Sequence, residues 1–252
     1  MPKGFYFLIG AQFASGLADN ALLILGIYFL NEQGYPGWWA PLLKFSLTLA
    51  YVLLASLVGP LSDAYPKNRL MACMNALKMV GVLMLLLGIQ PLCAFALIGL
   101  AASVYAPSKY GLATESVEPR LLVRANAWLE VSVVLSVVLG IALGGALTGL
   151  TESGVATELA DYFSLVSGVM IKTQTLPAMS LVLCVYLTAA ALNFGLQPMR
   201  RRAVLVPLTW QSVRWGAFWK TNRKLWRDPL GGVSLYVTTL YWGVGAVMQF
   251  AV

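Results

Sequence analysis

Seven apolar runs, divided by short polar links, make up most of the chain. Roughly 20 apolar residues in an α-helix cross the hydrocarbon core of a bilayer, and the runs are of about that length. The pattern predicts membrane helices at about 5–30, 41–61, 70–88, 91–113, 127–150 and 177–197, with a seventh that starts near residue 232 and continues to Val252. The sequence therefore predicts an all-α, polytopic membrane protein.

The composition agrees with a membrane protein and argues against several classes of function. Of the 252 residues, 59% are hydrophobic and 11% are charged, whereas soluble domains have roughly 25% charged residues. The chain has no histidine, and its three cysteines show no close spacing, so we expect no metal site, no disulfide and no histidine-dependent catalysis. No P-loop or Rossmann fingerprint occurs, so we expect neither an enzyme nor a cofactor.

The basic residues set the predicted orientation. Lys and Arg outnumber Asp and Glu by 17 to 10, and the excess is concentrated between Arg200 and Arg227. Such an excess of Lys and Arg in short links marks the cytoplasmic side. The second, fourth and sixth links between the predicted helices carry this excess, whereas the other three links contain a single basic residue, Lys172. We therefore expect a cytoplasmic N-terminus, an acidic external stretch at 151–176 with helical spacing of its apolar residues, and no nucleic-acid partner.

The sixth link, residues 198–229, combines basic with aromatic residues. One helical stripe holds Lys220, Arg223, Lys224 and Arg227, and another side holds the apolar residues Trp215, Phe218, Trp219, Leu225 and Trp226. This predicts a helix on the inner membrane surface, with its basic face toward anionic headgroups. The alternative is a solvated basic linker, which so many tryptophans disfavour.

Polar residues inside the apolar runs are candidate functional residues. Asp19 and Asn20 interrupt the first run, and an ionisable side chain within a span usually faces the bundle interior or a water-filled cavity. The alternative is that these two residues only tie their helix to a neighbour. Lys78 in the third run is a second candidate, and its alternative role is to pair with Glu130 or another acid inside the bundle.

The turn after the second run carries a motif, in which Gly59-Pro60-Leu61-Ser62-Asp63 is followed by Lys67 and Arg69. It resembles the loop between helices 2 and 3 of the major facilitator superfamily, whose pattern is roughly Gly-x-x-x-Asp-x-x-x-x-Arg. Glycine permits close helix approach, the aspartate can accept a hydrogen bond at a helix end, and the basic residues hold the cytoplasmic side. A generic charged loop is the alternative.

Three further segments, at 11–22, 105–111 and 124–130, narrow the resemblance. Their sequences are AQFASGLADNAL, YAPSKYG and RANAWLE, and together they resemble the lysophospholipid transporter branch of that superfamily. This resemblance implies a fold of twelve helices in two six-helix bundles, of which the chain covers about half. It implies a bundle at 1–197, a basic cytoplasmic link at 198–229, and the start of helix 7 of a missing C-terminal bundle at 230–252.

The resemblance also implies roles for single residues. Headgroup or coupling contacts fall to Asp19, Asn20 and Lys109, and the gating loop contains Gly59, Asp63, Lys67 and Arg69. Asp19 is about 21 Å along its helix from Phe5, whereas Lys109 lies near the inner face, so the two need not contact one headgroup. In the seventh run, Gln249 stands where a basic residue is expected, which puts a charge network between the first and seventh helices in doubt.

The function implied by the resemblance is secondary transport of lysophospholipids in the bacterial inner membrane, for re-acylation by an acyltransferase and acyl-carrier-protein synthetase. A zwitterionic lysophospholipid offers a phosphate and an ammonium, for which a lysine and a carboxylate are complements. The alternatives are a major-facilitator exporter of hydrophobic drugs and a truncated, non-transporting membrane fragment. One bundle supplies only one wall of a transport pathway, so we expect no transport by these residues alone.

Overall fold

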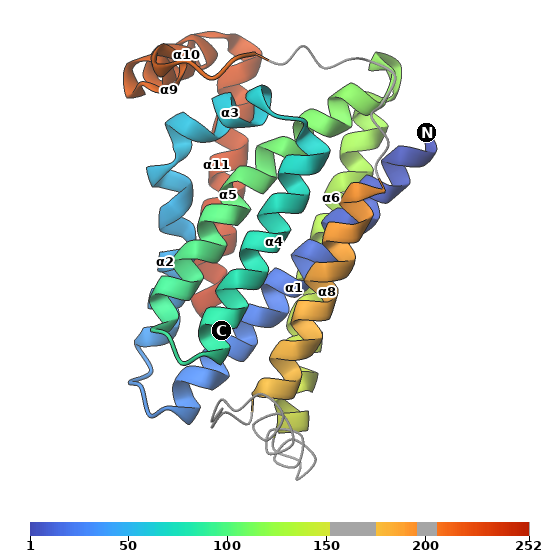
Figure 1. Ribbon diagram of the computed structural model, residues 1–252. Helices are drawn as coiled ribbons and strands as arrows, with labels where there is room; N and C mark the ends of the chain where they lie inside the picture. The colour runs from blue at the N-terminus through green and yellow to red at the C-terminus, as the bar shows by residue number, and fades with distance from the viewer. Residues whose placement is uncertain (152–174, 196–205, 252) are drawn as a thin grey trace.

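The computed structural model describes residues 1–151, 175–195 and 206–251, and the regular elements of these residues are all helices (Figure 1). The long helices are α1 (Lys3–Glu32), α4 (Lys67–Leu86), α5 (Pro91–Ser116), α6 (Leu122–Thr151), α8 (Leu176–Phe194) and α11 (Pro229–Ala251). The shorter elements are α2 (Trp39–Leu53), α3 (Ala55–Ala64), the 3-10 turn η1 (Pro119–Leu121), α9 (Trp210–Val213) and α10 (Trp215–Arg227). The helical spacing expected at 151–176 falls almost entirely outside the described residues.

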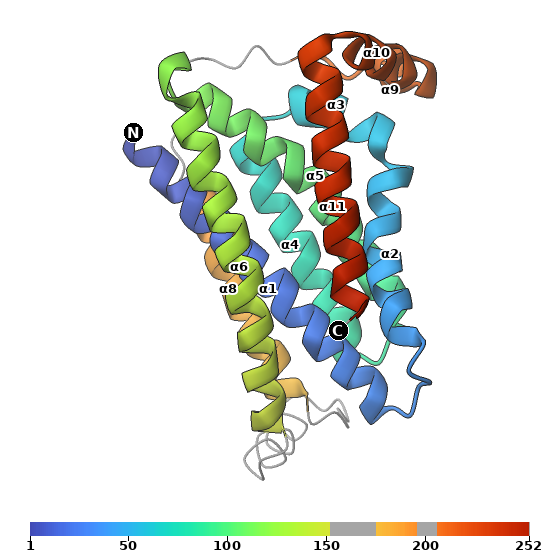
Figure 2. The ribbon, with the colours of Figure 1, turned by 180° about the vertical axis from the view of Figure 1, so that it is seen from behind.

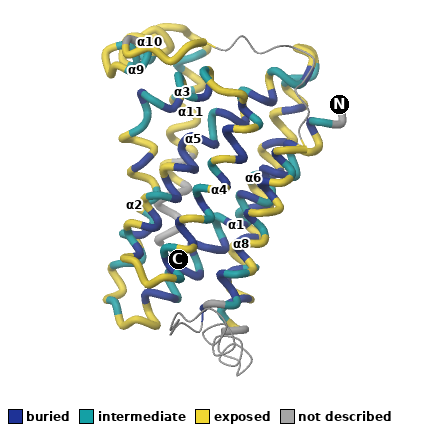
Figure 3. The backbone as a smooth tube through the Cα atoms, viewed as in Figure 1, coloured by how far each residue is buried: buried dark blue, intermediate teal, exposed yellow. Residues whose placement is uncertain are grey.

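Five described helices, α1, α4, α5, α6 and α8, are long and apolar enough to cross a membrane, and α2 with α3 makes a sixth span if the pair counts as one bent helix. The predicted class, an all-α polytopic membrane protein, is confirmed. Along the middle of α6 the outer side is apolar (Figure 3), with Val131, Val134, Leu135, Val138, Leu139 and Ile141 exposed. The exposed charged residues of this helix, Arg124 and Glu130, lie nearer its start.

The second span differs from its prediction. The sequence predicts one helix at 41–61, whereas the chain leaves the helical conformation at Leu54 (φ −96°, ψ 3°) and α2 and α3 meet at a bend of 66°. Proline is the usual signal for such a break, but the nearest one is Pro60, which lies within α3. The sequence therefore carries no marker at the bend itself.

The helices pack in a bundle around α1, α4 and α5. α1 packs against α6 and α8, α4 packs against α5 and α8, and α2 packs against α5. Glycines permit the closest of these contacts: a Cβ atom on Gly140 of α6 would lie 2.7 Å from the carbonyl oxygen of Leu17 in α1. The main core cluster fills the space among α1, α4, α5 and α8, with Leu22, Leu25, Phe29, Phe95, Val82 and Tyr186 among its fully buried members.

The two ends of the bundle differ. The turn between α3 and α4, the corner between α5 and α6, the N-terminus, and helices α9 and α10 lie at one end (Figure 1). The link between α1 and α2 and the link between α4 and α5 lie at the other. α11 runs along the side formed by α2 and α5, in front of them when the molecule is seen from behind (Figure 2). The N-terminus and α10 thus share one end of the bundle.

Candidate functional site

A polar pocket of about 80 Å³ opens between α1, α2, α4 and α5. Its lining includes Asp19 of α1, Tyr51 of α2, Lys78 of α4, and Tyr105 and Lys109 of α5. All of these residues belong to candidate membrane spans, where charged side chains are expensive unless they are paired or face water. The pocket is therefore the first candidate for a binding site in the described bundle.

Lys78 is the most deeply buried charge of the pocket. Its side chain is 1% exposed, and its Nζ atom lies 2.7 Å from Oδ2 of Asp19, whose side chain is 27% exposed. The Tyr186 hydroxyl of α8 donates to Oδ1 of the same carboxylate at 2.7 Å. Asp19 thus joins α1 to α4 and α8, and it is the acid that pairs with Lys78.

A further layer of polar atoms supports this ion pair. Lys78 also donates to the Ser15 hydroxyl at 3.0 Å, and Ser15 donates to Oδ1 of Asn75 at 2.8 Å. The ammonium lies 5.0 Å from the ring centre of Tyr105 and 5.7 Å from that of Tyr186, within the range of cation–π attraction. Among the described residues, the buried Nδ2 of Asn75 and the hydroxyl of Tyr105 have no hydrogen-bond partner.

Lys109 has a different environment in the same pocket. It is 7% exposed, and its Nζ atom lies 4.8 Å from the ring centre of Tyr110. No carboxylate of the described residues lies within ion-pair distance of it. The pocket therefore holds two lysines against one aspartate, and its one cation without an acid partner in the described chain is Lys109.

Two other candidate residues lie outside the pocket. Asn20 donates from its Nδ2 to the carbonyl oxygen of Gly16 at 2.8 Å, and its Cβ faces Gly140 of α6. Glu130 is exposed and accepts a hydrogen bond from the Tyr110 hydroxyl at 2.8 Å. The structure thus brings Asp19, Lys78 and Lys109 together and places Asn20 and Glu130 elsewhere.

Sequence reasoning missed the supporting residues Ser15, Asn75 and Tyr186. A helical signal for two of them exists, because Ser15 precedes Asp19 by four positions and Asn75 precedes Lys78 by three, which are the spacings of one helix face. Tyr186 has no such signal, since only the packing of α8 against α1 brings its hydroxyl to the carboxylate.

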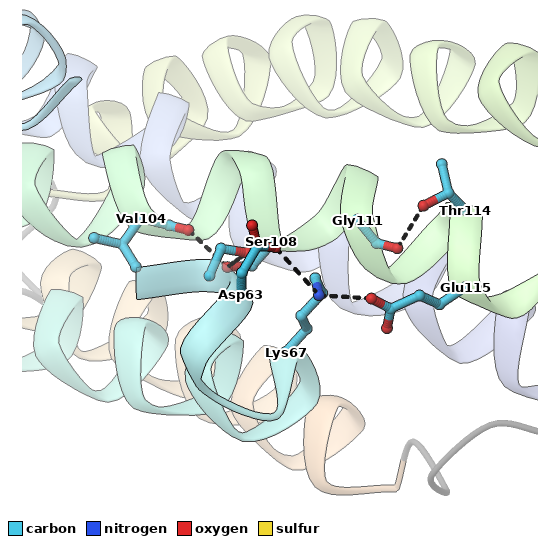
Figure 4. Close-up of polar contacts among 8 residues, drawn as sticks. Asp63, Lys67, Val104, Ser108, Gly111, Thr114 and Glu115 are labelled. Atoms are coloured by element: carbon cyan, nitrogen blue, oxygen red, sulfur yellow. Dashed lines mark hydrogen bonds and ion pairs between the residues drawn. The ribbon is translucent and has the colours of Figure 1, made fainter. Parts of the chain in front are cut away.

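A second polar cluster lies at the turn between α3 and α4 (Figure 4). Lys67 is buried, and its Nζ atom lies 2.6 Å from Oε1 of Glu115 on α5 and 3.8 Å from Oδ1 of Asp63 on α3. The side chain lies over Gly111 of α5, where a Cβ atom would come within 2.6 Å of its Cε. Lys67 therefore holds the start of α4 against the end of α5.

Hydroxyl contacts continue this cluster into the bundle. The buried Ser108 hydroxyl donates to the carbonyl oxygen of Val104 at 2.9 Å and lies 3.1 Å from the hydroxyl of Ser62, so it bridges α5 and α3 (Figure 4). The remaining candidates of the gating loop are less involved. Arg69 is exposed and forms no ion pair with a described residue, and a Cβ atom on Gly59 would meet no described atom within 4 Å.

The fold and the pocket define the class: a multi-pass helical membrane protein that encloses paired and unpaired charges within its bundle. No family model matches the chain. It is 31% identical, over 241 residues and 95% of its length, to the protein named lysophospholipid transporter LplT of Yersinia pestis (strain Pestoides F) and to its namesake in Yersinia pseudotuberculosis (serotype O:3, strain YPIII). The matched region is 53% of each, so the chain spans about half the length of the curated relatives it matches.

The chain is therefore homologous, over nearly its whole length, to proteins named as lysophospholipid transporters. The predicted resemblance is confirmed. The relatives are named as transporters, which agrees with the expectation of a protein that is not an enzyme.

Proposed function

We propose that this chain supplies one bundle of a secondary transporter that moves lysophospholipids across, or between the leaflets of, a bacterial inner membrane. In this proposal 1–197 is the first six-helix bundle, 198–229 is the cytoplasmic link, and 230–252 begins the second bundle. The N-terminus is cytoplasmic. The lipid delivered to the inner leaflet is then re-acylated by an acyltransferase and acyl-carrier-protein synthetase.

The proposal rests on one observation: the described residues that line the pocket include two lysines, Lys78 and Lys109, and only one carboxylate, that of Asp19. Lys78 is already engaged by Asp19 and Ser15, whereas no described carboxylate lies within ion-pair distance of Lys109. A lysophospholipid phosphate is an anion that a lysine binds through charge-assisted hydrogen bonds. We assign Lys109 to the phosphate, and Asp19, the more exposed member of the buried pair, to the positive group of a zwitterionic headgroup or to a coupling cation.

The pocket is small enough to be only one part of a substrate site. Liquid water occupies about 30 Å³ per molecule, so a pocket of about 80 Å³ has room for only a few waters. Sites that enclose a whole small molecule usually measure about 300–1,000 Å³. In this proposal the pocket receives part of a headgroup, and a second bundle supplies the opposite wall, as in transporters whose substrate lies between two repeats.

The turn cluster fits the gating step of the same mechanism. Lys67 joins α3, α4 and α5 at the bundle end where the N-terminus lies, through Asp63 and Glu115. Asp63 is mostly exposed, so water can replace its contact at low cost, whereas the contact of Glu115 with the buried Lys67 costs more to break. We propose that the cluster holds this end of the bundle closed and rearranges when the two bundles move.

The test is uptake of labelled lysophospholipid by membrane vesicles that contain this chain together with the second half of one of the Yersinia relatives. We expect saturable uptake that other lysophospholipids compete away and that neutral or cationic drugs do not. The chain alone should give none. Lys109→Gln should lower uptake by about tenfold to a hundredfold, whereas Lys44→Gln, which removes a lysine of α2 that does not line the pocket, should retain it. Competition by drugs instead of lysophospholipids would identify an exporter and refute the proposal.

A further inference from the structure

α10 carries two chemically different faces. Its basic residues Lys220, Arg223, Lys224 and Arg227 are all exposed, and the helix contains no acidic residue. At 100° per residue they fall on one arc of the helix, and its apolar residues fall on another. Much of the apolar side is uncovered, because Trp219 is 61%, Trp226 51% and Trp215 46% exposed.

The surrounding contacts fix α10 across the end of the bundle (Figure 1). Before the helix, the backbone N–H of Val206 donates to the carbonyl oxygen of Asp63 at 3.1 Å, and α9 and α10 both pack against α3. After the helix, the Asp228 carboxylate accepts from the backbone N–H of Gly231 at 2.7 Å, so the chain turns directly into α11. A Cβ atom on Gly231 would lie 2.7 Å from the carbonyl oxygen of Leu225, which shows how tight this corner is.

The position, the charge and the aromatic residues all suit one occupant. α10 lies at the end of membrane-crossing helices, at the level where a bilayer presents its headgroups, and tryptophan rings favour that interface. A basic stripe without acids complements anionic headgroups, and each Lys or Arg near an anionic surface strengthens the attraction to it by about fivefold. We propose that α10 is a docking surface for the anionic lipid headgroups of the leaflet at this end of the bundle. These lipids are not transported, so the proposal does not depend on the transport function.

The test uses the full chain, with its three native cysteines replaced and Asn222→Cys carrying an environment-sensitive dye. Asn222 lies on the same side of the helix as the apolar residues, so the dye reports on that side. Because Asn222 is not aromatic, replacing it removes none of the tryptophans. The protein is placed in nanodiscs of phosphatidylcholine and phosphatidylglycerol, in which one lipid or the other carries bromine as a quencher. We expect brominated phosphatidylglycerol to quench about fivefold more than brominated phosphatidylcholine at equal content, and high salt to reduce the difference.

Two matched pairs of arginines make the test specific. Arg223→Gln with Arg227→Gln neutralises two residues four positions apart on α10, and Arg120→Gln with Arg124→Gln does the same at the corner between α5 and α6. The first pair should clearly lower the quenching ratio, although Lys220 and Lys224 remain on the stripe, and the second should leave it unchanged. The salt titration of the dye-labelled chain needs no arginine variant, so the test does not depend on how those variants fold.

Three outcomes would overturn the proposal. The first is equal quenching by both lipids in the unaltered chain, which would mean insertion without selection for anionic lipid. The second is equal loss of the lipid preference in both arginine pairs. The third is a dye that neither lipid quenches, which would mean that water or a protein partner covers this face.

Discussion

Two lysines of α4 occupy the same face of the helix and have different surroundings. Lys67 and Lys78 are eleven residues apart, close to three turns and about 16 Å along the axis. Lys78 has a carboxylate, a hydroxyl and two aromatic rings around it inside a membrane span. Lys67 has two carboxylates at the bundle end, both of them more exposed than the lysine.

The difference lies in what each contact costs to break. In a buried ion pair, removal of one partner leaves a charge with no solvent, whereas at an exposed edge water and salt replace the lost partner. The inner pair of Lys78 and Asp19 should therefore stay intact unless another cation takes the place of Lys78 at the Asp19 carboxylate. The outer cluster around Lys67 should be easier to open, because Lys67 has a second carboxylate, Asp63, which is mostly exposed.

The largest effect is expected from Asp19→Asn. This change leaves Lys78 buried without a counter-charge and should destabilise the bundle by about 3–5 kcal/mol. Adding Lys78→Met should restore most of that loss, because an apolar side chain of similar length needs no partner. Thermal unfolding of the purified chain in detergent measures both variants. Equal destabilisation by the single and the double change would contradict a paired role.

Lys109→Gln should separate function from stability. Lys109 has no acid partner among the described residues, so its loss should change the free energy of unfolding by less than about 1 kcal/mol. A hydrogen bond to a charged group contributes about 1.5–3 kcal/mol, which corresponds to a loss of lysophospholipid uptake of about tenfold to a hundredfold. Uptake by the two-half transporter, normalised to membrane abundance, is the measurement. Uptake at the unaltered rate would show that Lys109 does not contact the substrate.

The sequence predicted the fold closely and the site in part, for physical reasons. Long apolar runs specify helices, so α1 was expected at 5–30 and spans Lys3–Glu32. A charge inside such a run is conspicuous, so Asp19, Lys78 and Lys109 could all be found. Their pairing depends on which helices are neighbours, and apolar runs do not encode that. For the same reason Glu130 was considered for Lys78, and Tyr186 was overlooked.

Glu115→Gln should loosen the outer cluster without unfolding the bundle. It leaves Lys67 with Asp63 alone, at 3.8 Å, and should cost about 1–2 kcal/mol because Glu115 is partly exposed. A cysteine at the buried Ser62, in a background without the native cysteines, reports the opening between α3 and α5. Its rate of modification by a maleimide should rise about tenfold. High salt should raise the rate in the unaltered cluster and leave the inner pair intact. If neither Glu115→Gln nor high salt changes the rate of maleimide modification, the cluster is not a gate.

The smallest effect is expected from Arg69→Gln, which tests whether two basic residues of the same motif differ because their contacts differ. Lys67 and Arg69 stand two positions apart in the same motif, but Lys67 is buried between two carboxylates, whereas Arg69 is exposed and forms no ion pair with a described residue. A surface change of this kind alters stability by less than about 0.5 kcal/mol. Lys67→Gln should therefore accelerate modification of the cysteine at position 62, and Arg69→Gln should not. If both do so equally, Arg69 belongs to the closed gate through contacts beyond the described residues, and the contrast between the two halves of the motif is wrong.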